Sequence, residues 1–153
     1  MSILKSKKAE GYRGYIFSRN INNNFIPQRV QNLVIKDFAK RKNFFFKLSS
    51  TEYIMNGSYL MLGALVKEVK TLEGVIFYSY EMLFDNVSFC KDALLKIIKN
   101  KKNVYFALEE FQVKNYTDIK NLLKIIQIKK NSLSFTESDT LKELLNKSNK
   151  KKR

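Results

Sequence analysis

Two kinds of apolar pattern alternate along the chain. Strand-like apolar runs cover residues 13–19, 44–50, 75–79 and 104–109. Between and after these runs, apolar residues recur at the i, i+3, i+4 and i+7 spacing of one helical face. The four helical stripes are Val30, Leu33, Val34 and Phe38; Leu62, Leu65, Val66 and Val69; Cys90, Ala93, Leu94, Ile97 and Ile98; and Ile119, Leu122, Leu123 and Ile126. The pattern predicts the element order β-α-β-α-β-α-β-α.

The strand runs are nearly continuous in apolar residues, which is typical of a parallel sheet covered by helices on both faces. We therefore predict an α/β fold, a flavodoxin-like three-layer sandwich with a mainly parallel sheet of four or five strands. Right-handed crossovers leave few topologies, and we favour the strand order 2-1-3-4. Lys47 then lies in an edge strand, where a charge is tolerated. Pro27 is a favourable start for the first helix, and Ser58 can cap the second.

The chain of 153 residues has the size of one domain. We predict a flexible basic head at 1–10, a single α/β domain at 11–130 and a C-terminal extension at 131–153. From Ser132 onward the extension can hold a short strand or helix, and from Lys147 we expect a disordered basic tail.

The net charge of the chain bears on whether the protein binds a polyanion. The chain has 29 Lys and Arg against 14 Asp and Glu, a formal net charge of +15. Such an excess is typical either of a protein that binds a polyanion such as nucleic acid, or of a solvated charge that reflects composition. Because much of the excess lies in the head and the tail, we favour the solvated charge. Nucleic acid stays open as a less favoured partner.

The residue inventory excludes several kinds of chemistry. His is absent, which removes the commonest general base and metal ligand, so we expect no metal and no cofactor. The single Cys90 excludes an internal disulfide and lies in an apolar stripe, which indicates a packing role. No apolar run approaches the ~20 residues of a membrane-spanning helix, and residues 1–8 do not resemble a signal peptide. We therefore expect a cytoplasmic protein.

Ligands of parallel α/β sheets bind beyond the carboxyl ends of the strands. The polar residues that follow the predicted strands or begin the first helix form our candidate ligand site: Ser18, Arg19, Gln28, Asn32, Glu52, Tyr53, Ser79, Tyr80 and Glu109. Glu52 and Glu109 are the candidate catalytic carboxylates. Each residue also has a structural alternative, namely a loop hydrogen bond, a surface ion pair or, for the tyrosines, packing. With no Gly-rich phosphate loop and no Ser-His pair, the reaction stays open.

Six further blocks of the sequence are informative: GYRGYIFSR at 11–19, PQRVQN at 27–32, SSTEY at 49–53, SYLML at 58–62, GVIFYS at 74–79 and FALE at 106–109. Together they resemble the sporadic carbohydrate cluster family of proteins. The resemblance implies a place in surface-carbohydrate biosynthesis. It does not imply a particular reaction or identify a catalytic residue.

A second similarity is to the catalytic domain of serine recombinases, which has the same β/α alternation, so the predicted fold is also resolvase-like. Those enzymes end their first strand in Tyr-X-Arg-Val-Ser, whereas this chain reads YIFSR at 15–19. After the third strand they carry Asp-Arg-Leu-Ser-Arg, and here the stretch is EMLFD at 81–85. Met82 and Asp85 thus replace two arginines that would neutralise a phosphoryl transition state, and we expect no recombinase chemistry.

Three functions are consistent with these patterns. The first is a protein of surface polysaccharide or glycan biosynthesis that binds or processes a sugar or nucleotide-sugar in the crevice. In it, Arg19 would face an anionic group, Glu52 and Glu109 the hydroxyls, and Tyr53 or Tyr80 the sugar ring. The second is a non-enzymatic partner or regulator of pathway enzymes. The third is a catalytically dead recombinase-like domain that binds nucleic acid. Enzymatic activity stays open, and a homo-dimer is one assembly considered.

Overall fold

The computed structural model describes residues 11–150, with side chains apart from those of 133–139 and 148–150. The predicted basic head lies outside the described residues. The elements are β1 (Tyr12–Phe17), α1 (Gln28–Arg41), β2 (Phe46–Glu52), α2 (Leu60–Glu68), the 3-10 helix η1 (Val69–Thr71), β3 (Gly74–Phe77), the 3-10 helix η2 (Tyr80–Asn86), α3 (Val87–Lys99), β4 (Asn103–Phe106), β5 (Phe111–Val113) and α4 (Tyr116–Lys150).

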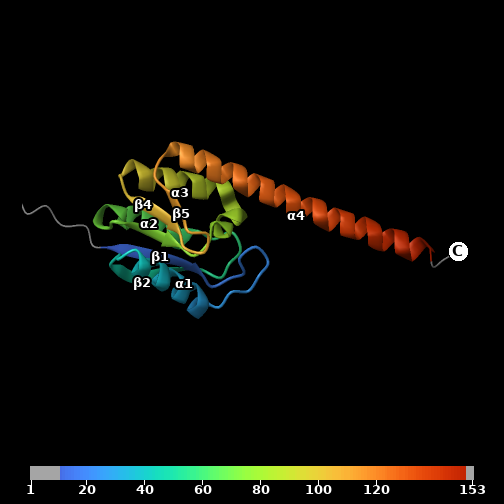
Figure 1. Cartoon of the computed structure of the whole chain (residues 1–153), viewed down its shortest axis with the longest axis horizontal. Helices are drawn as coiled ribbons and strands as arrows, with labels where there is room; N and C mark the ends of the chain where they lie inside the picture. The colour runs from blue at the N-terminus through green and yellow to red at the C-terminus, as the bar shows by residue number, and fades with distance from the viewer. Residues whose placement is uncertain (1–10, 151–153) are drawn as a thin grey trace, which may run out of the picture.

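One five-stranded sheet with the order β2-β1-β3-β4-β5 forms the middle layer, and helices cover it (Figure 1). Strands β1 to β4 are parallel neighbours, so the predicted order 2-1-3-4 is confirmed, with β2 and its Lys47 at an edge. The antiparallel strand β5 was not located by the sequence patterns. This strand is three residues long, which is too short to give a periodic signal in the sequence. It follows a tight turn in which Glu110 has a φ of 53°.

The buried face of α1 differs from the predicted stripe. Val30 and Leu33 are 41% and 60% exposed, whereas Ile35 and Phe38 are buried together with Gln31. The prediction is confirmed for Phe38 and, in part, for Val34, which packs against the core. It was wrong for Val30 and Leu33, because the helix directs the amide of Gln31 toward β1 in the first turn. The stripes of the other helices are confirmed: Leu62, Leu65, Val69, Cys90, Ala93, Leu94, Ile97, Ile119, Leu122 and Ile126 are buried.

Helix α2 begins without the predicted cap. Tyr59 occupies the N-cap position, and no side-chain cap is formed there. The hydroxyl of Ser58 instead donates to the carboxylate of Glu52 at 3.3 Å. Backbone N–H groups in the first turn of α2 donate to the same carboxylate, as described below.

Helix α4 projects far beyond the body of the domain (Figure 1). It continues through Lys150, into the basic tail that we predicted to be disordered from Lys147 onward. The predicted boundary at residue 130 therefore falls inside this helix. Among the described residues, no helix combines the length and apolar character that crossing a membrane requires.

Candidate functional site

The carboxyl ends of β1 to β4 share one edge of the sheet because these strands are parallel neighbours. Ser18 follows β1, and its hydroxyl donates to the backbone carbonyl of Glu52, the last residue of β2, at 2.6 Å. Ser79 follows β3, and its hydroxyl donates to Glu109, which follows β4, at 2.5 Å. Five of the predicted residues thus lie in two groups. We call Ser18, Arg19 and Glu52, together with Asp85, the ion-pair partner of Arg19, the inner cluster, and we call Ser79 and Glu109 the outer pair.

Glu52 of the inner cluster is 1% exposed and serves the fold. Its Oε2 accepts the phenol of Tyr15 at 2.8 Å and the backbone N–H groups of Met61 and Leu62 at 3.1 Å each. Its Oε1 accepts from the backbone of Tyr53 at 3.0 Å. The carboxylate therefore caps α2 across the chain, in place of the missing local cap. The ligand contact and the catalytic role expected for Glu52 are replaced by this structural role.

Arg19 is also directed into the protein, with 5% exposure. Its Nε donates to Asp85 Oδ2 at 3.0 Å, and its Nη1 donates to the carbonyls of Tyr53 and Ser58 at 3.1 and 2.8 Å. The guanidinium carbon lies 3.9 Å from the centroid of the Phe17 ring. These contacts tie the end of β1 to the loop before α2 and to η2. Arg19 is thus ion-paired and hydrogen-bonded inside the domain, where the prediction had placed it toward an anionic ligand, and among the described residues its buried Nη2 has no hydrogen-bond partner.

Gln31 is a buried polar residue that the sequence analysis did not select. Its Oε1 accepts the backbone N–H of Phe17 at 2.8 Å, and its Nε2 donates to the carbonyls of Phe17 and Ile26 at 2.9 and 2.8 Å. The side-chain amide thus pairs with the backbone of Phe17 at the end of β1 in the way that a neighbouring strand would. A usable signal was present, since Gln31, Ile35 and Phe38 recur at helical spacing.

The remaining candidates at this edge are scattered. Gln28 is exposed, and Asn32 accepts the hydroxyl of Ser49 on β2 at 2.6 Å. Tyr53 is 52% exposed. Tyr80 packs on the ring of Phe84, with the centroids 6.1 Å apart. The structure does not bring these four residues together with the outer pair, apart from Tyr80, whose backbone N–H reaches Glu109 Oε2 at 3.4 Å.

The outer pair lies beside a crevice of about 270 Å³ at the carboxyl edge. Its lining comprises Ile21, Asn24, Phe25, Ile26, Tyr78, Ser79, Glu81 and Leu108. Phe25 is 70% exposed at its rim, and Tyr78 is buried. Glu81 accepts hydrogen bonds from Asn22 and from Lys129 of α4. The crevice therefore combines aromatic surface with hydroxyl, amide and carboxylate groups.

Burial raises the pKa of Glu109, although the hydrogen bond from Ser79 acts in the opposite direction. The neighbouring negative charge of Glu81 raises the same pKa further. The outer pair is thus a place where a carboxyl group can hold a proton or donate a hydrogen bond. Glu109 is thus a predicted candidate whose surroundings favour the protonated form of its carboxyl group.

Cys90 and the acidic side chains bear on nucleophilic and metal chemistry in the described part of the chain. Burial raises the pKa of the Cys90 thiol to about 12, which agrees with the predicted packing role. No group of three or more acidic or Cys residues among the described residues could hold a metal ion.

Comparison with solved structures identifies the architecture. The chain superposes on a resolvase family site-specific recombinase from Streptococcus pneumoniae with a TM-score of 0.58 at 12% identity, covering 84% of this chain and 94% of that one. It superposes on the N-terminal catalytic domain of TP901-1 integrase with a TM-score of 0.55 at 16% identity, covering 78% and 97%. The fold is that of a resolvase-like α/β domain. No model of a protein family matches the sequence, and no curated protein matches it significantly.

The resolvase-like domain does not carry the arginines that the sequence comparison sought after the third strand. Met82 is fully buried, and its carbonyl accepts the phenol of Tyr59 at 2.6 Å. Asp85 is the ion-pair partner of Arg19. The Ser18 hydroxyl is directed at a backbone carbonyl, and no basic side chain of the described residues is among its hydrogen-bond partners. The inner cluster is therefore a set of internal contacts.

Proposed function

We propose that this resolvase-like domain acts in surface-carbohydrate biosynthesis and binds a sugar in the crevice beside the outer pair. The observation that carries the proposal is the hydrogen bond of 2.5 Å between Ser79 and Glu109 at the edge of a crevice rimmed by Phe25. Carboxylate, amide and hydroxyl groups beside an aromatic ring are the combination that recognises a ring bearing several hydroxyls. The sequence blocks that resemble the sporadic carbohydrate cluster family support the same reading.

The charges of the crevice favour a neutral sugar over the diphosphate of a nucleotide-sugar. Glu81 lines the crevice and Glu109 lies beside it, so a bound phosphate would meet two carboxyl groups. The nearby Lys129 is already paired with Glu81. With Arg19 buried against Asp85, the crevice has no free cation among its lining residues.

An enzymatic step, if there is one, would use Glu109. A carboxyl group with a raised pKa can protonate a leaving oxygen, and the negative charge of Glu81 helps to keep the proton on Glu109. A partner or regulator role for pathway enzymes would require the same binding without that proton transfer. Loss of kcat in Glu109→Gln at a sugar concentration that saturates the variant would identify the enzyme.

A second candidate function is nucleic-acid binding without catalysis. Similarity to two recombinase structures and a formal net charge of +15 favour it. Binding of this kind is carried by phosphate contacts, so the affinity for DNA would fall steeply with salt. Sugar binding in the crevice would not depend on salt, because its contacts are hydrogen bonds.

The decisive experiment is a calorimetric and thermal-shift screen of the full chain against monosaccharides, sugar acids, nucleotide-sugars and duplex DNA at two salt concentrations. A sugar that saturates the protein at 100 times its Kd should stabilise it by about 2.7 kcal/mol. Ser79→Ala and Glu109→Gln should weaken that sugar by roughly 10-fold each. Glu110→Gln is the matched control, because this neighbour pairs with Arg41 outside the crevice. Equal sugar affinity in all variants would contradict the proposal, and salt-sensitive DNA binding alone would favour the second candidate.

A further inference from the structure

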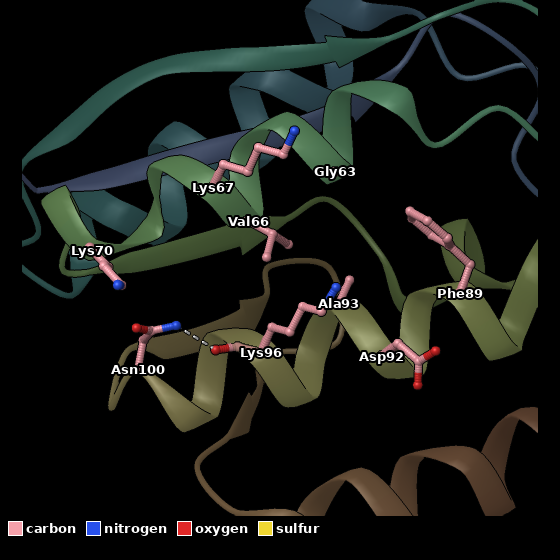
Figure 2. Close-up of a pocket in the computed structure, with 9 residues that line it drawn as sticks. All are labelled: Gly63, Val66, Lys67, Lys70, Phe89, Asp92, Ala93, Lys96 and Asn100. Atoms are coloured by element: carbon pink, nitrogen blue, oxygen red, sulfur yellow. Dashed lines mark hydrogen bonds between the residues drawn. The ribbon is translucent and has the colours of Figure 1, made fainter.

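Helices α2 and α3 lie side by side, and a groove runs between them (Figure 2). The groove shares no lining residue with the carboxyl-edge crevice. It has two adjoining parts of about 550 and 510 Å³, which share Gly63, Lys67 and Phe89. Each part is in the range of small-molecule sites. The apolar lining includes Val66 and Ala93.

Three lysines give this groove a positive rim. Lys67 and Lys70 lie on the α2 side and Lys96 lies on the α3 side, as Figure 2 shows. Among the described residues, none of the three ammonium groups has a hydrogen-bonded or ion-paired partner, and Asp92 is the sole acidic residue of the lining. The rim is therefore complementary to a ligand with more than one negative charge.

An aromatic ring stands at the junction of the two parts. Phe89 is 41% exposed and stacks on the buried Tyr59, with the ring centroids 5.8 Å apart and the planes at 24°. The stack holds Phe89 in place and leaves part of its ring open to the groove. A planar ring such as a nucleobase gains about 1 to 3 kcal/mol by stacking on such a residue.

Gly63 supplies an independent observation. It lies inside α2, where Gly costs roughly 0.5 to 1 kcal/mol relative to Ala. The fold does not require it, since a Cβ at this position would meet nothing nearer than Phe89 Cζ at 3.9 Å. Such a Cβ would instead stand in the groove beside the Phe89 ring. The missing side chain thus keeps open the space next to the aromatic surface.

We propose that this groove binds a nucleoside diphosphate or triphosphate, with the base on Phe89 and the phosphates among Lys67, Lys70 and Lys96. The site is separate from the sugar crevice and does not depend on it. A free nucleotide and the end of a nucleic-acid strand offer the same chemistry. The size of each part favours the free nucleotide.

The first test titrates the full chain, by isothermal calorimetry at moderate salt, with the diphosphates of adenosine, guanosine, uridine and cytidine. Inorganic pyrophosphate, the nucleosides and a single-stranded oligonucleotide of about ten residues serve as separate arms. At least one nucleoside diphosphate should bind more tightly than pyrophosphate or its own nucleoside by roughly 10-fold. Equal binding of pyrophosphate, binding of the oligonucleotide alone, or no binding in any arm would each overturn the proposal.

The second test uses Gly63→Ala, which should change stability and affinity in opposite directions. The added methyl group should raise Tm by about 1 to 4 °C because the helix gains propensity. It should also weaken the nucleotide by roughly 5-fold or more by narrowing the space beside Phe89. Lys96→Gln should weaken the nucleotide by about 5-fold, whereas Lys99→Gln on the same helix, outside the groove, should not. Unchanged affinity in both Gly63→Ala and Lys96→Gln would contradict the assignment.

Discussion

Arg19 and Asp85 form a hydrogen-bonded ion pair, with 3.0 Å between Nε and Oδ2, although 66 residues separate them in the chain. The side chain of Arg19 is 3% exposed and that of Asp85 is 40% exposed, so the carboxylate neutralises a buried cation from the surface. The pair connects the end of β1 to η2, the segment that follows β3. A resolvase-like fold thus uses a carboxylate to stabilise its own interior at a position where the recombinase pattern has arginine.

Replacing Asp85 with Ala should destabilise the protein by about 1 to 2 kcal/mol, because Arg19 would remain buried with one partner fewer. Urea unfolding followed by circular dichroism measures the change. Asp37→Ala is the control, since Asp37 forms an exposed ion pair with Arg41 on one helix and its loss should matter little. Equal destabilisation by both variants would show that the Arg19–Asp85 pair stabilises the fold no more than an exposed ion pair does.

The protein should neither cleave nor rejoin DNA. Met82 and Asp85 stand where positive charge would be needed, and the Ser18 hydroxyl is bonded to a carbonyl. Incubation with supercoiled plasmid, followed by denaturing electrophoresis and mass spectrometry, checks this expectation. A covalent DNA adduct at Ser18 that disappears in Ser18→Ala would refute it.

Glu52→Gln should destabilise the fold by about 2 to 3 kcal/mol, since an amide NH₂ would replace one oxygen among donors that all need an acceptor. Thermal and urea unfolding measure the change. Glu143→Gln, at an exposed position of α4, should leave stability nearly unchanged. If Glu52→Gln has the same unfolding free energy as the parent, the carboxylate does not stabilise α2 as a cap. Glu52 then becomes a candidate ligand group again.

Gln31→Ala should cost about 2 to 3 kcal/mol because it leaves the backbone N–H and carbonyl of Phe17 without partners inside the protein. Gln28→Ala removes a similar side chain from an exposed position of the same helix and should have little effect. Hydrogen exchange adds a local measurement, since the Phe17 amide should lose protection in Gln31→Ala. Retained protection would contradict the proposed contact.

Glu109 should make the parent protein less stable, relative to Glu109→Gln, as the pH rises. Its pKa in the fold lies above the ordinary glutamate value, so the folded state holds the proton more tightly than the unfolded state. The stabilisation is complete below the unfolded pKa and is lost as the pH rises through the folded pKa. Urea unfolding between about pH 4 and about pH 8 measures the difference. A constant difference between parent and Glu109→Gln would show that the pKa is not raised.

The local patterns predicted those parts of the fold that depend on short-range periodicity. The stripes of α2, α3 and α4 were confirmed because each helix buries apolar side chains at the helical spacing. The order 2-1-3-4 followed from apolar strands joined by helices, for which right-handed crossovers leave few arrangements. The stripe of α1 was misplaced only in its first turn, because a buried Gln31 looks polar in the sequence, while its hydrogen bonds to Phe17 exist only after folding.

The sequence by itself determined the α/β class, the strand order and the polar residues that reach the carboxyl edge of the sheet. Only the tertiary structure decided which of those residues face inward. Glu52 and Arg19 find their partners in α2 and η2, and no local pattern encodes pairs brought together from separate elements. Ser79 and Glu109 meet beside a crevice for the same reason, since their strands become neighbours only when the sheet forms. The physical difference is one of range, because helical and strand periods act within a few residues whereas a site depends on contacts that folding creates.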